Sequence, residues 1–97
     1  MINVSILGYG TIGSGVFQII RENGQIIAER TGEEITVKSI LDLRDFPGDI
    51  AEDIIVHDFA EIDSDDSVQI VVETMGGLHT AYEYVKASLE KGRSVCT

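Results

Sequence analysis

The chain has 97 residues, of which 43% are hydrophobic and 25% are charged, a composition typical of one ordinary globular domain. Its formal net charge is −10, and residues 45–66 carry nine acids with no lysine or arginine, so the chain offers no basic surface to nucleic acid. It shows no apolar run long enough to span a membrane and no secretion signal, and its single Cys96 fits a reducing compartment. We therefore expect a cytoplasmic location.

The first third of the chain predicts a strand, a tight loop and a helix. Residues 2–7 alternate apolar and small polar side chains, which is typical of a strand. After the loop, apolar side chains recur near helical spacing, and we predict a helix that ends near Arg30, with Gly32 as its stop. This spacing is formed by Ile12, Val16, Ile19, Ile20, Ile26 and Ile27.

The middle of the chain predicts a second strand over residues 35–43, followed by a break at Pro47-Gly48. The acidic stretch after this break contains only short apolar groups, so we expect brief elements and a solvated outer face there. Residues 68–72 form a nearly continuous apolar run, which is typical of an interior parallel strand buried on both faces.

The last third predicts a helix and the start of a further strand. Thr80 and Glu83 have the spacing of a capping box, and Gly92 is the expected helix stop. Residues 93–97 then begin a strand, where Cys96 is expected to be a buried, inert thiol. The expected apolar face of the helix consists of Leu78, Ala81, Tyr82, Val85 and Leu89.

The loop Gly8-Tyr9-Gly10-Thr11-Ile12-Gly13 has the G-x-G-x-x-G pattern directly after a strand and at the start of a helix. In this context Gly8 allows the turn, Gly10 lets a pyrophosphate approach the backbone, and Gly13 lets the helix pack closely. The helix N-terminus supplies free N–H donors to the phosphates. We predict that this loop binds a dinucleotide through Gly8, Gly10, Thr11, Ile12 and Gly13.

Together with the order of strands and helices, the loop predicts an α/β fold. We expect a Rossmann-type doubly wound parallel sheet that is incomplete at its C-terminal end, with residues 1–97 forming one NAD(P)-binding domain.

Two further positions are expected at the dinucleotide. Asp42 and Arg44 follow the second strand, where an acid binds a free ribose 2′-OH and favours NAD, whereas an arginine pairs with the 2′-phosphate of NADP. Arg44 could instead be a surface arginine paired with Asp45. Thr74 and Gly76 follow the interior strand and are expected near the nicotinamide, while Glu73 either acts there or fixes the loop.

No catalytic group and no metal site is predicted. A calcium loop starting at Asp63 would need glycine where Val68 stands and glutamate where Thr74 stands. His57, His79 and Cys96 show no zinc spacing.

The motifs together resemble the N-terminal cofactor domain of homoserine dehydrogenase. Residues 8–16 are similar to the family's G-x-G-T-[VI]-G-x-G-V opening, residues 71–77 to its V-V-E-x-x-G-G segment, and residues 91–97 to the end of its A-L-x-x-G-K-x-V-V-T segment. Thr80, Arg93 and Cys96 depart from the usual proline, lysine and valine. The chain ends before the family's asparagine-lysine pair and its substrate domain, which hold the catalytic lysine and aspartate.

The resemblance implies an oxidoreductase that interconverts aspartate 4-semialdehyde and homoserine by hydride transfer, on the route to threonine, methionine and isoleucine. The intact parent would take a small amino-acid substrate, whereas the 97 residues alone are expected to be inactive. Because the edge of the sheet lacks neighbours, we also expect a homo-oligomer. Two alternatives stay open: another Rossmann amino-acid dehydrogenase or reductase, and a non-catalytic nucleotide-sensing module.

Overall fold

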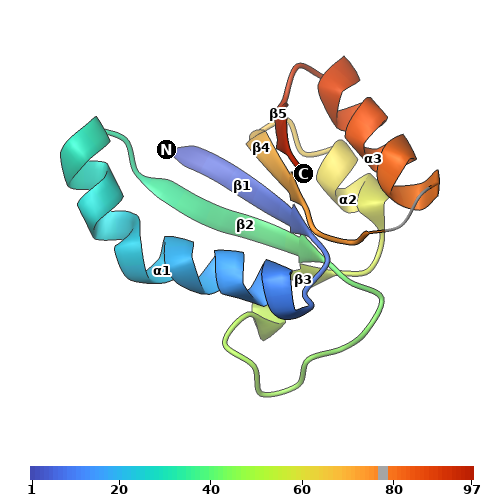
Figure 1. Ribbon diagram of the computed structural model, residues 1–97, viewed down its shortest axis with the longest axis horizontal. Coiled ribbons are helices and arrows are strands. Elements are labelled where there is room, and N and C mark those ends of the chain that lie inside the picture. Colours follow the sequence, from blue (N-terminus) through green and yellow to red (C-terminus); the bar gives the residue numbers. More distant parts are fainter. Residues whose placement is uncertain (77–78) are drawn as a thin grey trace.

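The computed structural model describes residues 1–76 and 79–97, which form a five-stranded parallel sheet with helices on both faces (Figure 1). The strands are β1 (Ile2–Leu7), β2 (Ile35–Leu41), β3 (Ile55–Val56), β4 (Val68–Glu73) and β5 (Ser94–Cys96). The helices are α1 (Thr11–Thr31), α2 (Phe59–Asp63) and α3 (His79–Glu90), and η1 (Glu52–Ile54) is a short 3₁₀ turn. None of the helices in the described part of the chain is long and apolar enough to cross a membrane.

The strand order β3-β2-β1-β4-β5 places the first strand in the centre of the sheet. The chain leaves β1 through α1 to reach β2 on one side, and it later returns to pair β4 with the other side of β1. All four strand pairings are parallel, so the carboxyl ends of the strands share one edge. The predicted α/β fold with a Rossmann-type parallel sheet is thereby confirmed.

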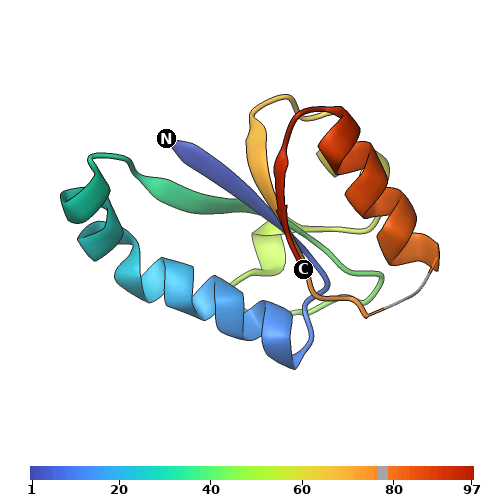
Figure 2. The same ribbon diagram turned by 45° about the horizontal axis from the view of Figure 1, so that its top comes forward.

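Side chains from alternate positions of β1 build two separate cores, one on each face of the sheet. Val4 and Ile6 pack with Phe17 of α1, whereas Leu7 packs with Phe59 and Ile62 of α2. The alternation of a strand produces this division, since successive side chains point to opposite faces. Figures 1 and 2 accordingly show α1 on one side of β1 and both α2 and α3 on the other.

The predicted strand over residues 2–7 and the stop of α1 are confirmed. Gly32 ends α1 in the left-handed conformation (φ +76°), and its N–H donates to the Ala28 carbonyl at 2.9 Å. Only part of the expected apolar stripe faces the core, however. Val16 and Ile20 pack against the sheet, whereas three isoleucines of the stripe, seven residues apart, are exposed. These are Ile12, Ile19 and Ile26.

Several predictions for the second half of the chain are wrong in detail. Ala81 and Ser88 of α3 are buried and Tyr84 packs against the core that contains Phe59 and Ile62 of α2, while Tyr82 and Leu89 are exposed. The Tyr84 ring stacks on Phe59 with the ring centroids 4.1 Å apart, and this contact sets the rotation of the helix.

Three further corrections concern caps, strand burial and the thiol. Thr80 lies inside α3, so it is not the N-cap residue that a capping box requires. β4 is an interior strand as predicted, but Gln69 is exposed, so the strand is not buried throughout. Cys96 is exposed because β5 forms the edge of the sheet. Gly77, the last residue of the V-V-E-x-x-G-G segment, and Leu78, expected on the apolar face of the helix, lie outside the described residues.

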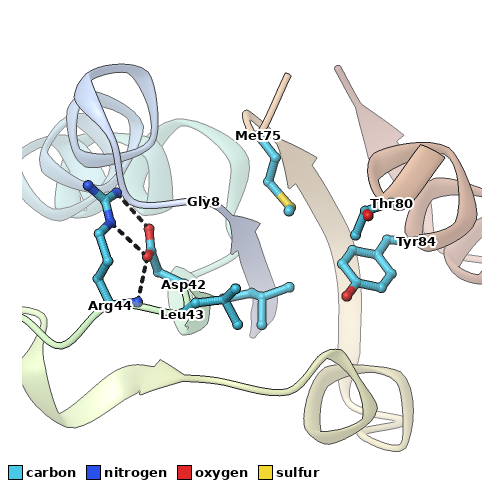
Figure 3. Close-up of a pocket in the computed structure, with 8 residues that line it drawn as sticks. Gly8, Asp42, Leu43, Arg44, Met75, Thr80 and Tyr84 are labelled. Atoms are coloured by element: carbon cyan, nitrogen blue, oxygen red, sulfur yellow. Dashed lines mark hydrogen bonds and ion pairs between the residues drawn. The ribbon is translucent and has the colours of Figure 1, made fainter. Parts of the chain in front are cut away.

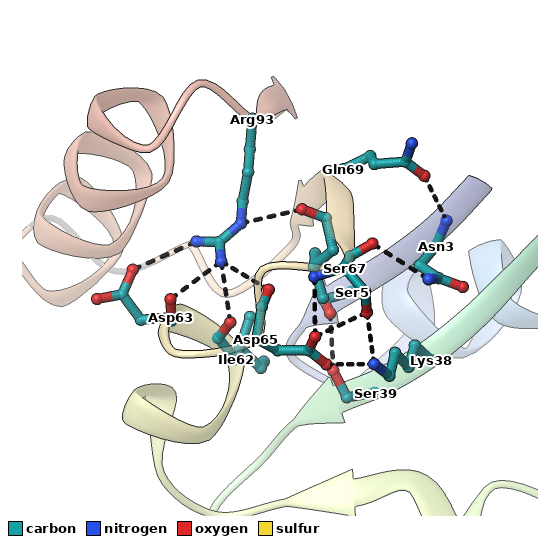
Figure 4. A network of polar contacts seen from close by, with 11 residues as sticks. Asn3, Ser5, Lys38, Ser39, Ile62, Asp63, Asp65, Ser67, Gln69 and Arg93 are labelled. Atoms are coloured by element: carbon teal, nitrogen blue, oxygen red, sulfur yellow. Dashed lines mark hydrogen bonds and ion pairs between the residues drawn. The ribbon is translucent and has the colours of Figure 1, made fainter. Parts of the chain in front are cut away.

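A buried arginine joins the C-terminal part of the sheet to the acidic stretch (Figure 4). The Arg93 guanidinium donates to the carbonyl oxygens of Ile62, Asp63, Asp65 and Val68 at 2.9–3.2 Å and pairs with the Asp63 carboxylate at 3.3 Å. Asp65 also pairs with Lys38 of β2 at 2.6 Å. The acidic stretch is therefore not a uniformly solvated face, because two of its members neutralise basic side chains.

Candidate functional site

A cleft of about 410 Å³ opens at the carboxyl edge of the sheet (Figure 3). It lies where β2, β1 and β4 end. β1 is the central strand, and the chain pairs first β2 with one side of it and later β4 with the other side. In open α/β sheets, ligands bind in the crevice formed at such a switch point. The cleft is lined by Gly8, Leu41, Asp42, Leu43, Arg44, Met75, Thr80 and Tyr84.

The glycines of the loop between β1 and α1 meet different spatial demands. Gly8 has φ +101°, a left-handed conformation that L side chains rarely adopt. A Cβ on Gly13 would lie 2.0 Å from the Gly8 carbonyl oxygen, so only glycine permits this approach of the helix to the loop. A Cβ on Gly10 would meet nothing within 4 Å, which leaves open space above the loop backbone. The roles predicted for Gly8 and Gly13 in the turn and in close packing are confirmed.

The first turn of α1 presents backbone donors toward this open space. Gly10 is the N-cap residue in an extended conformation, and within the described part of the chain no side chain caps the helix. The Ser14 N–H donates to the Gly10 carbonyl at 2.9 Å as the first helical bond, so the amides of Thr11, Ile12 and Gly13 precede the helical ladder. Such an uncapped N-terminus attracts an anion through its free N–H groups and its partial positive charge.

Asp42 and Arg44 form one hydrogen-bonded unit at the mouth of the cleft (Figure 3). The Arg44 guanidinium donates to both carboxylate oxygens of Asp42, through Nε and Nη2, each at 3.0 Å. The backbone N–H groups of Tyr9 and Arg44 donate to the same carboxylate at 3.0 and 2.9 Å. The side-chain bonds from Arg44, with help from these two amides, hold the pKa of Asp42 well below its usual value of 3.8.

This unit corrects two parts of the prediction. β2 ends at Leu41 rather than at residue 43, because Asp42 turns to accept the Tyr9 N–H of the glycine loop. The surface pairing of Arg44 with Asp45 is also wrong, since Arg44 pairs with Asp42 and Asp45 pairs with His57 at 2.9 Å.

Tyr9 fixes the glycine loop to the segment that carries Asp42. Its hydroxyl donates to Asp49 at 2.7 Å, and its ring meets Phe17 and Phe46 edge-on, with centroids 6.1 and 5.0 Å away. Burial, supported by the Asp49 carboxylate, raises the pKa of Tyr9 to about 12. Sequence reasoning missed this role because the partners of Tyr9 lie 33 and 40 positions further along the chain.

The residues after β4 support the loop from its other side. Thr74 Oγ1 lies 2.9 Å from the Leu7 carbonyl and 3.1 Å from that of Gly8, so its hydroxyl hydrogen is directed to the end of β1. Glu73 accepts the N–H groups of Met75 and Gly76 at 2.5 and 3.1 Å, and Gly76 is left-handed with φ +72°. Glu73 is therefore a loop-fixing acid, one of the two roles expected for it.

The apolar wall of the cleft was not predicted from the sequence. Leu43 is 85% exposed at the mouth, and Met75, in the loop after β4, and Tyr84 of α3 line the same cleft (Figure 3). Leu43 could have indicated this wall, because a large apolar side chain that follows a strand at the ligand-binding edge suits a flat, apolar ligand group.

Among the described residues, no three His, Cys, Asp or Glu side chains are placed to hold a metal ion.

The parallel sheet, its switch point at β1 and the glycine-lined turn into α1 define a Rossmann-type α/β domain. An NAD binding oxidoreductase from Klebsiella pneumoniae has the same fold, with a TM-score of 0.75 over 97% of this chain at 20% identity. No family model matches the sequence.

Similarity to individual proteins narrows the class further than the shared fold does. The chain is 34% identical to the homoserine dehydrogenase of Pseudomonas aeruginosa and 35% identical to that of Corynebacterium glutamicum, in both cases over 99% of this chain and 22% of the relative. The crystal structure of S. aureus homoserine dehydrogenase at pH 7.0 superimposes with a TM-score of 0.88 at 36% identity, covering 97% of this chain and 25% of that one. The chain is thus a homologue of homoserine dehydrogenases over nearly its whole length. It spans about a quarter of the length of these relatives.

Proposed function

We propose that residues 1–97 form the cofactor-binding domain of a homoserine dehydrogenase and bind NAD or NADP at the carboxyl edge of the sheet. The observation that carries the proposal is the open space at Gly10 above an uncapped helix N-terminus. The amides of Thr11, Ile12 and Gly13 would donate to the pyrophosphate there. Gly8 and Thr74 shape the loop beneath it, and Gly76 would border the nicotinamide.

The adenosine end would lie in the cleft. Leu43, Met75 and Tyr84 provide apolar contacts for the adenine ring, and Asp42 and Arg44 lie where the ribose would reach the end of β2. The complete enzyme would transfer hydride between the nicotinamide and aspartate 4-semialdehyde. No residue of this chain is assigned to the proton transfer, so we expect the 97 residues alone to leave homoserine unoxidised in a spectrophotometric assay that follows NAD(P)H.

Gly10→Ala tests the pyrophosphate site directly. The new methyl group meets no protein atom, so thermal unfolding should be unchanged, while NADH should bind at least about tenfold more weakly because the methyl group fills the phosphate position. Gly15→Ala is the matched control, because its Cβ also lies in open space but away from the N-cap. Equal NADH affinity of the Gly10 variant and the wild type would overturn the proposal.

The choice between NAD and NADP is tested at the ribose end. Asp42→Ala should weaken NADH binding more than NADPH binding, because it removes the acceptor for a free 2′-hydroxyl. Arg44→Ala should weaken NADPH binding, because it removes a partner for the 2′-phosphate. Dissociation constants of both cofactors for both variants, measured by nucleotide fluorescence, decide which residue dominates.

We further propose a homo-oligomeric parent located in the cytoplasm, without nucleic acid or membrane as partners. Support comes from the net charge of −10 and from β5, which forms an edge of the sheet as a strand of three residues. Light scattering over a range of protein concentrations tests the oligomer, and a monomer at every concentration would contradict it.

A further inference from the structure

The carboxylate of Asp42 already accepts four hydrogen bonds, as many as its two oxygens can ordinarily take. Oδ1 accepts the backbone N–H and the Nε–H of Arg44, and Oδ2 accepts the Tyr9 N–H and the Nη2–H of Arg44. Each oxygen therefore has one backbone donor and one guanidinium donor. A ribose hydroxyl that approaches Asp42 finds no free acceptor site.

The two kinds of donor differ in how firmly they are held. The backbone donors belong to the glycine loop and to the chain directly after β2, and the Asp42 side chain is only 9% exposed. The Arg44 side chain is 65% exposed and also lies over the Phe46 ring, with its Cζ 5.1 Å from the ring centroid. The guanidinium is thus the mobile partner, and it has a second surface on which to rest after it leaves the carboxylate.

The guanidinium matches the ribose in number and arrangement of donors. Nε and Nη2 of an arginine are parallel donors that fit the two oxygens of a carboxylate. The neighbouring 2′- and 3′-hydroxyls of an adenosine ribose also offer two adjacent donors. They can replace the two guanidinium donors one for one, while the backbone donors from Tyr9 and Arg44 keep the carboxylate in place.

From this match, we propose that Arg44 is an internal competitor of the cofactor, which occupies the ribose position on Asp42 and must be displaced when an adenosine ribose binds. The inference rests on the proposed dinucleotide site and adds a regulation of that site. It predicts that the free site is closed by an ion pair and that the free energy of breaking this pair reduces the affinity for the ribose. Because the pair is largely solvent-exposed on the arginine side, the reduction is modest, about 1.5- to 5-fold in the dissociation constant.

ADP and 2′-deoxy-ADP test the proposal, since they share the adenine and diphosphate and differ only in one ribose hydroxyl. Their dissociation constants are measured by calorimetry for the wild type and for Arg44→Met, which keeps an unbranched apolar side chain near Phe46. We expect the preference for ADP over 2′-deoxy-ADP to be about 1.5- to 5-fold larger in the Arg44 variant, because the diol no longer has to displace the guanidinium. Adding Asp42→Asn to that variant should remove the gain.

A spectroscopic measurement reports the displacement itself. The Arg44 Nε–H resonance, identified by its absence from Arg44→Met, should shift when ADP is added and should change much less with 2′-deoxy-ADP. Arg21→Ala, on α1, is the control for the loss of one positive charge, and it should leave the ADP preference unchanged.

The outcomes separate the inference from the function on which it rests. Failure of the wild type and all variants to bind ADP would overturn the proposed dinucleotide site. A second outcome would overturn only the role of Arg44 as a competitor. In that outcome ADP binds, its preference over 2′-deoxy-ADP is the same in the wild type and Arg44→Met, and the Arg44 resonance does not shift.

Discussion

The contact between α1 and the glycine loop makes a quantitative prediction for Gly13→Ala. The added Cβ would lie 2.0 Å from the Gly8 carbonyl oxygen, 2.9 Å from the Gly8 carbonyl carbon and 3.0 Å from Thr74 Oγ1. An ordinary van der Waals contact begins near 3.4 Å. To lengthen the Cβ–oxygen distance from 2.0 Å to this value, the helix and the loop would have to separate by about 1.4 Å. Two of the three obstructing atoms are backbone, so no side-chain rotation can relieve the clash.

Overpacking of this kind costs about 1–3 kcal/mol and occasionally more. The gain in helix propensity from glycine to alanine, at most about 1 kcal/mol, is too small to offset it. Gly15→Ala is the matched control because its Cβ meets no atom within 4 Å in the same helix, and it should stabilise the chain by about 0.5–1 kcal/mol.

Urea unfolding followed by circular dichroism at 222 nm measures both changes. We expect the midpoint of the Gly13 variant to fall and that of the Gly15 variant to rise, with similar slopes. The Gly13 variant should also lose NADH binding, because the loop that forms the phosphate site has moved. A Gly13 variant as stable as the wild type would refute the packing argument.

Three further predictions concern buried charge, pH and the thiol. Arg93→Lys should lower the free energy of unfolding by about 1–3 kcal/mol, because an ammonium group cannot reach the four carbonyls that the guanidinium contacts; unchanged urea unfolding would contradict this. The bonds from Lys38 and Ser67 lower the pKa of Asp65 from 3.8 to about 2. The folded state therefore takes up this proton less readily than the unfolded state, so the stabilisation is present above about pH 4 and is lost as the pH falls through 2. Between pH 5 and pH 2, Asp65→Asn should show a smaller decline in urea midpoint than the wild type, and parallel declines would count against it. Cys96 should react fully with Ellman's reagent without denaturant, and protection of the thiol would be inconsistent with its exposure on β5.

The parts of the fold that were predictable from sequence depend on neighbouring residues. Strand alternation and the glycine spacing fix β1, the turn and the start of α1 within the first 13 residues, and Gly32 ends the helix by its own conformational freedom. The positions of Asp42 and Arg44 near the loop were also predictable, because parallel strands end at a common edge.

Errors arose where a distant contact decides between local alternatives. The apolar residues of α3 allow more than one buried face, and the stack of Tyr84 on Phe59 selects the face with Ala81. β2 could have continued to residue 43, but the Tyr9 N–H draws Asp42 out of the strand. The burial of Arg93 depends on carbonyl oxygens of an irregular turn, which leave no pattern in the sequence.

The central position of β1 has a consequence for the order in which the chain folds. Asn3 pairs with Thr36 and with Val68, which lie 33 and 65 positions further along the chain (36 − 3 and 68 − 3). β1 precedes the other four described strands along the chain, and it gains its second neighbour only after β4 has been made. Until then α1, β1 and β2 can associate, but one edge of β1 stays open to other strands. Closing the longer loop carries the larger entropic cost, so the docking of β4 onto β1 is expected to limit the folding rate.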